Sequence, residues 1–556
     1  MQSRFTSFER AISIVLMLVL LAGAISVASS QSASASVPLF DNLGTHHYAI
    51  TTRVSLAQRY FDQGLRLYYA FNHAEAIRAF EEAARLDPDC ALCYWGLALA
   101  HGPNINAPME REAALAAYNA IQKAIALEAT AHTKERALIR ALAARYAAEP
   151  PENRSLLDTA YAEALRDVAK QYPADDEVAT LYAEALMDLS PWNYWTADGH
   201  PRANTPEILA RLERVLAANP NHPGANHFYI HALEAAQPER AVAAAERLAT
   251  LMPGAGHVVH MPAHIYIRVG RYLDAIAANE HAVHADEAYI QDHQPGSGIY
   301  TVGYYPHNYD FLAFAASMIG RSRQAVGAAE KMTAIQPKNL LREPGMTFLQ
   351  HHLTRHLQMK VRFAHWDDIL EASAPTEDMA HARAMWQYAR GRACAARGSI
   401  KEAEEALSYV RRIAHTPDVA SLRLEFNTSG AILRIASEVL AGHVAEAKGD
   451  TKTATAHLRE AVRLEDALTY GEPPEWSVPV RQELGMMLLR GDRAGDAEQA
   501  FRQDLKRFPD NGWSLRGLEL ALRRQGRAEE ADRVKARFSK VWASADVEAP
   551  PPPAQT

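Results

Sequence analysis

Cysteine is scarce in this 556-residue sequence, which contains only Cys90, Cys93 and Cys394. The first two form a C-x-x-C pair, but the strand-then-helix context of a thioredoxin motif is missing around them. The pair instead stands at the start of a predicted helix. We predict a structural or incidental role; an oxidising compartment would allow the two thiols to pair, and the sequence leaves open whether they do. Redox and metal-binding roles are the alternatives.

Strong charge of one sign is also lacking, since the formal net charge is −8 and no basic stripe occurs. This argues against a nucleic-acid partner and against nonspecific attraction to anionic membranes. Extended runs of Val, Ile and Thr are scarce, whereas Ala and Leu dominate, a composition that favours helices. The motifs of nucleophile elbows, zinc metalloproteases, phosphate loops and dinucleotide-binding sites are missing as well.

Long apolar runs are missing except near the start, where Arg4 and Arg10 precede the run at residues 11–25. A charged start, an apolar middle and an A-S-A exit at residues 33–35 are typical of a secretory signal peptide. The run is shorter than the about 20 residues that span a bilayer, so an uncleaved anchor is the weaker alternative. We expect cleavage after Ala35 and a mature chain, without a membrane span, in the periplasm or outside the cell.

An internal repeat of about 34 residues organises the chain. Counted from Ala57, its clearest copy fills repeat positions 8, 20, 24, 27 and 32 with Gly64, Ala76, Phe80, Ala83 and Pro88. A second copy fills four of these positions with Gly485, Ala497, Phe501 and Pro509. The small residues allow two helices to approach closely, the aromatic ring fills the gap to the next unit, and the proline ends the second helix. This spacing resembles the tetratricopeptide repeat family.

Weaker copies of the repeat cover nearly all of the expected mature chain, with cores at Gly270, Gly320, Gly398, Gly449 and Gly526. The resemblance implies an all-α, right-handed superhelical solenoid of roughly eleven to twelve helix pairs that share one continuous core. The phrases HMPAHIYIRVGRY, NHPGANHFYIHALEA, YPHNYDFLAF and RFPDNGWSLRGLELAL resemble a group of exported bacterial tetratricopeptide proteins. That likeness supports the fold and implies nothing about activity.

Three inserts interrupt the repeat, at residues 189–206, 288–305 and 470–480. The first contains Trp192 and Trp195 among Pro and Gly, and we expect an ordered aromatic loop. Inserts of this length in a solenoid are usually functional or lid-like. The expected divisions are a signal peptide (1–35), an N-terminal and central array with a His-rich inner face (36–374), a C-terminal array (375–546) and a disordered tail (547–556).

Histidine is concentrated in the middle of the chain, with 13 of the 24 residues between His222 and His356. The family resemblance implies that repeat positions 2, 5 and 9 face a concave groove. His257, His260 and His264 take these positions in one unit, and His307 and Asp310 take the first two in the next. Pro262 lies within this stretch, so the helix either kinks there or begins there after an approach loop.

Three interpretations of these histidines are open. In the first, the histidines cap helices and form hydrogen bonds within the stack. In the second, they hold a transition metal such as zinc, copper or iron, with the carboxylate oxygen of Asp310 as a further ligand. In the third, they line a groove for an anionic ligand or peptide. The metal set would be His257, His260, His264, His307 and Asp310. The groove set would be His227, His231, His351, Trp95, Glu184, Tyr266, Arg268 and Tyr304, although a packed Trp95 and a solvated Glu184 are the simpler alternatives for those two.

The leading functional hypothesis is an exported scaffold that binds a protein, a peptide or a small ligand in its concave groove, with a His-rich central site for a transition metal. The alternative is a metal-dependent enzyme whose active site lies inside the solenoid. An enzyme requires a closed cluster of ligands, whereas a scaffold requires an open, continuous groove.

Overall fold

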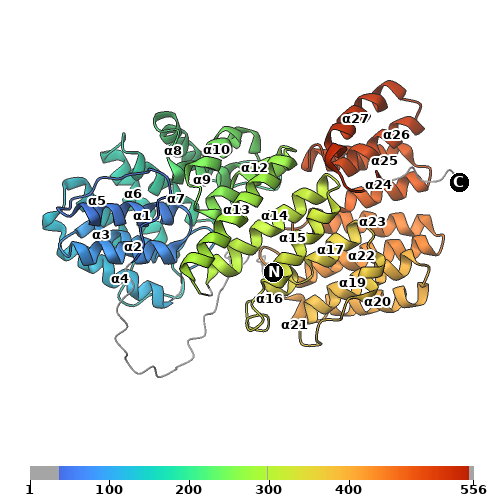
Figure 1. The fold of residues 1–556 in the computed structure, drawn as a ribbon, viewed down its shortest axis with the longest axis horizontal. Helices are drawn as coiled ribbons and strands as arrows, with labels where there is room; N and C mark the ends of the chain where they lie inside the picture. The colour runs from blue at the N-terminus through green and yellow to red at the C-terminus, as the bar shows by residue number, and fades with distance from the viewer. Residues whose placement is uncertain (1–36, 110, 297, 550–556) are drawn as a thin grey trace, which may run out of the picture. The chain divides into compact units, whose positions relative to one another are not determined.

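The computed structural model describes residues 37–109, 111–296 and 298–549, and it is helical throughout (Figure 1). The described residues contain no β-strand beyond three isolated bridges, which confirms the all-α prediction. The predicted signal peptide and most of the predicted tail lie outside the described residues. None of the described helices combines the length and the hydropathy that crossing a bilayer requires.

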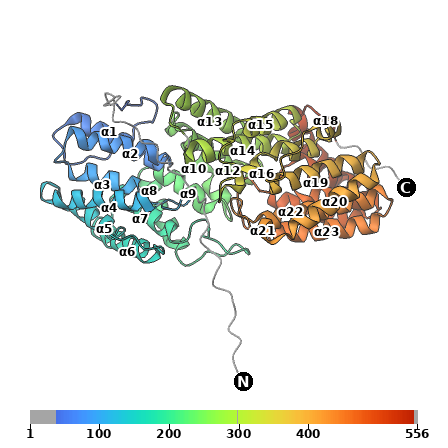
Figure 2. The ribbon, with the colours of Figure 1, turned by 90° about the horizontal axis from the view of Figure 1, so that it is seen from below.

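The chain divides into two compact units, residues 1–261 and 262–556. This boundary lies upstream of the expected division at residues 374/375, and a functional division at that point stays a prediction. Unit 1 consists of five consecutive helix pairs and a short final helix (Figures 1 and 2). Its helices are α1 (Ser55–Tyr69) with α2 (His73–Leu86), α3 (Ala91–Ala100) with α4 (Arg111–Ala126), α5 (Thr133–Ala143) with α6 (Ser155–Gln171), α7 (Asp176–Asp188) with α8 (Thr205–Ala218), α9 (Pro223–Leu233) with α10 (Pro238–Leu251), and α11 (Gly256–His260).

Unit 2 contains seven further pairs, which brings the total to the upper end of the predicted range. Its pairs are α12 (Pro262–Arg268) with α13 (Tyr272–His293), α14 (Tyr305–Met318) with α15 (Ser322–Ala334), α16 (Thr347–His352) and α17 (Arg355–Arg362) with α18 (Trp366–Glu371), α19 (Ala380–Ala396) with α20 (Ile400–Ala414), α22 (Ser429–Ala447) with α23 (Thr451–Asp466), α24 (Val480–Arg490) with α25 (Ala494–Arg507), and α26 (Gly512–Arg524) with α27 (Ala528–Val541). Short helical turns lie at Glu128–Thr130, Tyr300–Tyr304, Pro417–Ala420 (α21) and Trp542–Ser544.

The glycine and phenylalanine positions of the repeat pack directly against each other, as their side-chain sizes predict. A Cβ atom added to Gly64 would lie 2.8 Å from the ring of Phe80, and one added to Gly96 in the next pair would lie 2.4 Å from the same ring. Near the C-terminus, Gly485 and Gly517 would place a Cβ atom 2.4 and 2.1 Å from the ring of Phe501. Each phenylalanine is therefore wedged between two glycines of successive pairs, and any larger residue would overlap the ring.

Two local expectations need correction. A helix does begin at Pro262, as one alternative predicted, but the preceding residues form the short helix α11 and not an approach loop. The insert at 288–305 is helical at its start, because α13 continues to His293. No helix-breaking residue precedes Gln294, which ends α13 in a left-handed conformation (φ 46°) just before Pro295. By contrast, the aromatic insert lies between α7 and α8, and the 470–480 insert lies between α23 and α24, as expected.

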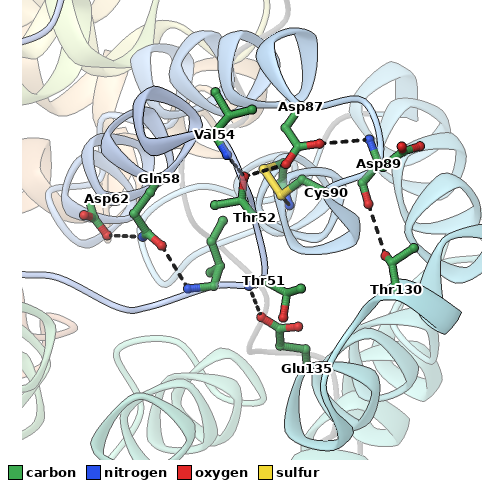
Figure 3. The surroundings of a disulfide bond; sticks show 12 residues. Thr51, Thr52, Val54, Gln58, Asp62, Asp87, Asp89, Cys90, Thr130 and Glu135 are labelled. Atoms are coloured by element: carbon green, nitrogen blue, oxygen red, sulfur yellow. Dashed lines mark hydrogen bonds between the residues drawn. A yellow bond between two sulfur atoms is a disulfide. The ribbon is translucent and has the colours of Figure 1, made fainter.

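Cys90 and Cys93 form a disulfide at the start of α3, where both are buried (Figure 3). The N-terminal segment, residues 37–54, is held near this bond by hydrogen bonds. The Thr51 N–H donates to Glu135 (2.6 Å) and the Thr52 hydroxyl donates to Asp87 (2.5 Å), as Figure 3 shows. The disulfide thus belongs to the packed interior of unit 1, which supports the structural role predicted for it.

The first and the last pair of unit 1 meet. Helix α1 contacts α9, and the hydroxyls of Tyr68 and Tyr69 at the end of α1 donate to Glu184 and Glu177 of α7. All four of these side chains are buried. Buried hydrogen bonds between polar side chains therefore join the end of α1 to α7.

Candidate metal centre

Two histidines of α9 face one another in the interior of unit 1. His227 and His231 are four residues apart and therefore lie on the same side of the helix; their exposed fractions are 0% and 2%. The helix that carries them begins with a sequence suited to a helix start. His222 is its N-cap, with Nδ1 accepting from the Ala225 N–H (3.2 Å), and Pro223 occupies a position where no N–H donor is needed.

Hydrogen bonds at Nδ1 determine which ring nitrogen of each histidine carries the proton. Nδ1 of His227 lies 2.7 Å from the carbonyl oxygen of Tyr69, and because a carbonyl only accepts, Nδ1 holds the hydrogen. Nδ1 of His231 lies 3.4 Å from a carboxylate oxygen of Glu234, a longer contact in which an ionised carboxylate only accepts and Nδ1 is the donor. In the neutral rings both Nε2 atoms then carry a lone pair, and these two atoms are 3.1 Å apart.

Two lone pairs at this separation repel each other unless a proton or a metal ion lies between them. Two nitrogens that each lie 2.0–2.1 Å from a tetrahedral metal are about 3.3–3.4 Å apart, close to the separation found here. An Nδ1–H held by a backbone carbonyl or by a carboxylate is also the usual outer contact of a metal-bound histidine. The arrangement of His227 and His231 therefore fits a transition metal.

His257 of α11 completes a group of three. One ring nitrogen of each of His227, His231 and His257 lies within 4.8 Å of the others. The ring centroid of His257 lies 5.0 Å from that of His227 and 6.4 Å from that of His231, and its exposed fraction is 2%. Three imidazoles are a known ligand set for zinc, and because they are neutral they leave the charge of the metal available to polarise a further ligand.

Aromatic side chains line this group. The ring centroid of Phe71 lies 4.5 Å from that of His227, and the Trp192 ring lies edge-on to His231 at 5.1 Å. Trp192 donates through Nε1 to Asn106 (3.0 Å), and Trp195 donates to the carbonyl of Ala232 in α9 (2.7 Å). The aromatic loop predicted from the sequence is thus fixed against the helix that carries two of the histidines.

A second polar cluster in unit 1 joins His46, Glu177 and His222, and it borders a pocket of about 540 Å³. Nε2 of His46 and Nε2 of His222 lie 3.2 and 3.4 Å from the same oxygen of Glu177. Because Nδ1 of His222 accepts from a backbone N–H, its Nε2 must carry the hydrogen. An Nε2–H cannot bind a metal, so this cluster fits a hydrogen-bond network and not a metal centre.

The carboxylate of Glu177 is the acceptor at the centre of that network. Burial alone would raise the pKa of Glu177, but His46 and His222 outweigh it and lower the pKa well below its usual range. The hydroxyl of Tyr69 donates to the other carboxylate oxygen. Since the carbonyl of Tyr69 holds His227, one residue of α1 connects the two clusters.

The remaining members of the predicted metal set divide between the units. His260 is the last residue of α11 in unit 1, whereas His264, His307 and Asp310 belong to unit 2. There, Nδ1 of His264 lies 3.2 Å from Glu472, and the ring centroids of His264 and His307 are 5.7 Å apart. Asp310 forms a buried ion pair with Arg355 (2.7 Å), so its carboxylate would have to contact Arg355 and a metal ion at the same time.

His351, a predicted groove residue, is held by hydrogen bonds at both ring nitrogens. Its Nε2 donates to the carbonyl of Glu475 (2.9 Å), and its Nδ1 lies 3.1 Å from Nε2 of His381. Nδ1 of His381 in turn accepts from the hydroxyl of Ser429 (2.8 Å). Burial lowers the pKa of His351 well below its usual value and that of His381 to about 3, so this chain is neutral and serves the packing of unit 2.

The other predicted groove residues have separate surroundings. Trp95 is buried and stacks near Phe61 (6.5 Å). Glu184 is buried, accepts from the Tyr68 hydroxyl (2.7 Å), and has a pKa raised by burial and by the neighbouring Asp188. In unit 2, Tyr266 lies under the guanidinium of Arg271, Arg268 lies 3.6 Å from Glu472, and Tyr304 packs edge-on to Tyr300.

Reasoning from the sequence did not identify Phe71, Tyr69, Glu177 and Glu234 as neighbours of the histidines. Tyr69 and Phe71 reach the histidines through the tertiary contact between α1 and α9, Glu177 lies on α7, and Glu234 meets His231 within α9 three residues away. The signal that was available is Phe71, which stands in a turn where other repeats carry glycine.

No known protein family and no curated protein matches this chain. Solved structures of three helical proteins are similar at low identity. The human IFIT1 dimer with m7Gppp-AAAA is 12% identical, with 89% of this chain and 92% of that chain covered and a TM-score of 0.29. Cut9 in the APC/C Cut9–Hcn1 hetero-tetramer is 12% identical, with 84% of this chain and 76% of that chain covered and a TM-score of 0.31. A chain of Naa15/Naa10 bound to HypK is 14% identical, with 87% of this chain and 71% of that chain covered and a TM-score of 0.22. Values this low transfer no function.

Proposed function

We propose that this protein is a helical-repeat scaffold that binds one transition-metal ion in unit 1 through His227, His231 and His257. The observation that carries the proposal is the 3.1 Å separation of two Nε2 atoms whose rings both have Nδ1 engaged by acceptors. Zinc, copper and iron all accept imidazole ligands. The burial of all three imidazoles favours a closed metal centre over a peptide groove at this position.

The proposal includes export to the periplasm or the outside of the cell. The disulfide between Cys90 and Cys93 supports it, because disulfides persist in oxidising compartments and are rare in the cytosol. A protein, peptide or small ligand that binds elsewhere on the repeat array is compatible with this proposal and stays a prediction.

The test is elemental analysis of the protein purified without a His tag or chelator. We expect about one equivalent of metal in the wild type, and less than about a tenth in the His227→Ala/His231→Ala variant, because binding is lost with two of three ligands. Circular dichroism checks that the variant keeps its helical content. The exposed His415 provides the matched control, since His415→Ala should retain the metal.

A second double variant, His260→Ala/His264→Ala, distinguishes this assignment from the set inferred from sequence alone. We expect it to retain most of its metal. Loss of metal in this variant together with retention in the His227→Ala/His231→Ala variant would contradict the proposed ligands. Absence of bound metal from the wild type, even after incubation with zinc, copper or iron, would refute the function itself.

A further inference from the structure

The turns that join the two helices of a pair share a backbone feature. One residue, directly before the N-cap of the second helix, takes a left-handed conformation in eight of the pairs. Glycine holds this position five times, with φ between 74° and 83°: Gly270, Gly320, Gly398, Gly449 and Gly526. In the other three pairs, the residue at this position is Phe71 (φ 55°), Ala364 (φ 57°) or Asp492 (φ 55°).

Phe71 is the residue least suited to this position. Aspartate tolerates the left-handed region and alanine is small, but a bulky side chain there is an outlier. Phe71 is also almost completely buried, with 1% of its surface exposed. A strained residue of this kind persists where the surrounding structure requires its side chain, and such residues cluster at functional sites.

The ring of Phe71 packs against all three candidate ligands. Its centroid lies 4.5 Å from that of His227, 5.4 Å from that of His257 and 6.1 Å from that of His231, and it is nearly parallel to the last two. Glycine at position 71 would suit the backbone but would leave a ring-sized space beside the imidazoles.

We infer that Phe71 is kept at this strained position to shield the three-histidine metal centre from water and so to slow the release of its metal. The apolar surroundings of a metal site control solvent access, and the flat ring restrains the orientation of the imidazoles it covers. Phe71 binds no metal itself and acts through the ligands. The inference rests on the proposed function of unit 1.

The experiment uses the full-length protein loaded with Co²⁺, whose visible absorption reports its coordination, and follows metal release to excess chelator. Phe71→Ala removes the ring and keeps the backbone strain, whereas Phe71→Gly removes both. We expect both variants to release Co²⁺ at least about tenfold faster than the wild type, as for other outer-contact residues of metal sites. We also expect weaker absorption, because water that enters the site raises the coordination number.

Asp492→Gly is the matched control, because it relieves the same backbone conformation in a turn of unit 2 and should release Co²⁺ at the wild-type rate. If the two small variants do not fold, Phe71→Leu keeps the apolar bulk without the flat ring and should still release the metal faster than the wild type. Release at the wild-type rate from the folded Phe71 variants would overturn this inference while leaving the metal centre in place. A wild type that binds no Co²⁺ would overturn the proposed function and this inference with it.

Discussion

At the scale of single residues, the same side chain takes opposite roles in unit 1. His222 is the N-cap of α9 and His227 lies five residues further along the same helix. Nδ1 of His222 nevertheless accepts a hydrogen bond, whereas Nδ1 of His227 donates one. The hydrogen therefore resides on Nε2 in His222 and on Nδ1 in His227. This difference leaves only His227 with a lone pair for a metal, and no property of the residue type predicts it.

The carboxylate of Glu177 should stabilise the fold in a pH-dependent way. Its pKa is lowered in the folded state, so the ionised form stabilises at pH values above the unfolded pKa of about 4.3, and this contribution is lost as the pH falls through the folded pKa. We expect Glu177→Gln to lower the free energy of unfolding by about 1–3 kcal/mol between about pH 5 and 8, because one neutral amide oxygen and an NH2 group replace the two charged oxygens that accept from His46, His222 and Tyr69.

Urea unfolding of the wild type and the Glu177→Gln variant, followed by circular dichroism at several pH values, checks this prediction. The difference between the two should shrink progressively below about pH 4, where the carboxylate is protonated in the unfolded state, and disappear as the pH falls through the lowered folded-state pKa. A difference that grows on acidification would contradict the assignment of Glu177 as an ionised acceptor.

At the scale of elements, the aromatic loop between α7 and α8 is attached to the helix that carries His227 and His231. Trp195 is bonded to the backbone of α9, and Trp192 lies edge-on to His231. The tryptophan content of the insert made an ordered loop predictable. Its attachment point depends on a partner helix that lies beyond α8 in the chain.

Trp192 should report metal binding optically. A paramagnetic ion such as Cu²⁺ bound at His231 would lie within contact range of the indole and quench its fluorescence. We expect titration with Cu²⁺ to quench part of the emission of the eight tryptophans, and Trp192→Phe to abolish most of the metal-dependent change. Quenching of equal size in that variant would place the ion away from the loop.

At the scale of the whole molecule, the two compact units provide an internal comparison. All three proposed ligands lie in unit 1, whereas His351, His381 and their neutral hydrogen-bond chain lie in unit 2. In a repeat array each pair contacts mainly its neighbours, so stabilisation by a ligand is expected to remain local.

Hydrogen exchange with and without metal checks this expectation. At a free metal concentration about 100 times the Kd, binding stabilises the folded state by about 2.7 kcal/mol, which corresponds to an about 100-fold slower exchange of amides that open with the site. We expect this protection in α9 and α11, and little change in α22 to α25. Equal protection of both regions would show that the metal is not confined to unit 1.

The fold was largely predictable because it depends on local periodicity. Gly64, Phe80 and Pro88 recur with the spacing of a helix pair, and contacts between residues about one repeat apart follow directly from that spacing, as the wedging of Phe80 between Gly64 and Gly96 shows. The end of α13 was expected too early, at residue 288, although Pro295 marks the point where the chain leaves the helix.

The sequence by itself determined that this chain is an all-helical array of repeated pairs rich in central histidines, because helix periodicity and steric fit between neighbouring pairs are local properties. Only the tertiary structure decided that His257 joins His227 and His231, and only it brings the Tyr69 carbonyl of α1 to His227 across more than 150 residues. Hydrogen-bond partners such as the Tyr69 carbonyl and Glu234 then fix which nitrogen is available, and such partners are set by packing and not by spacing.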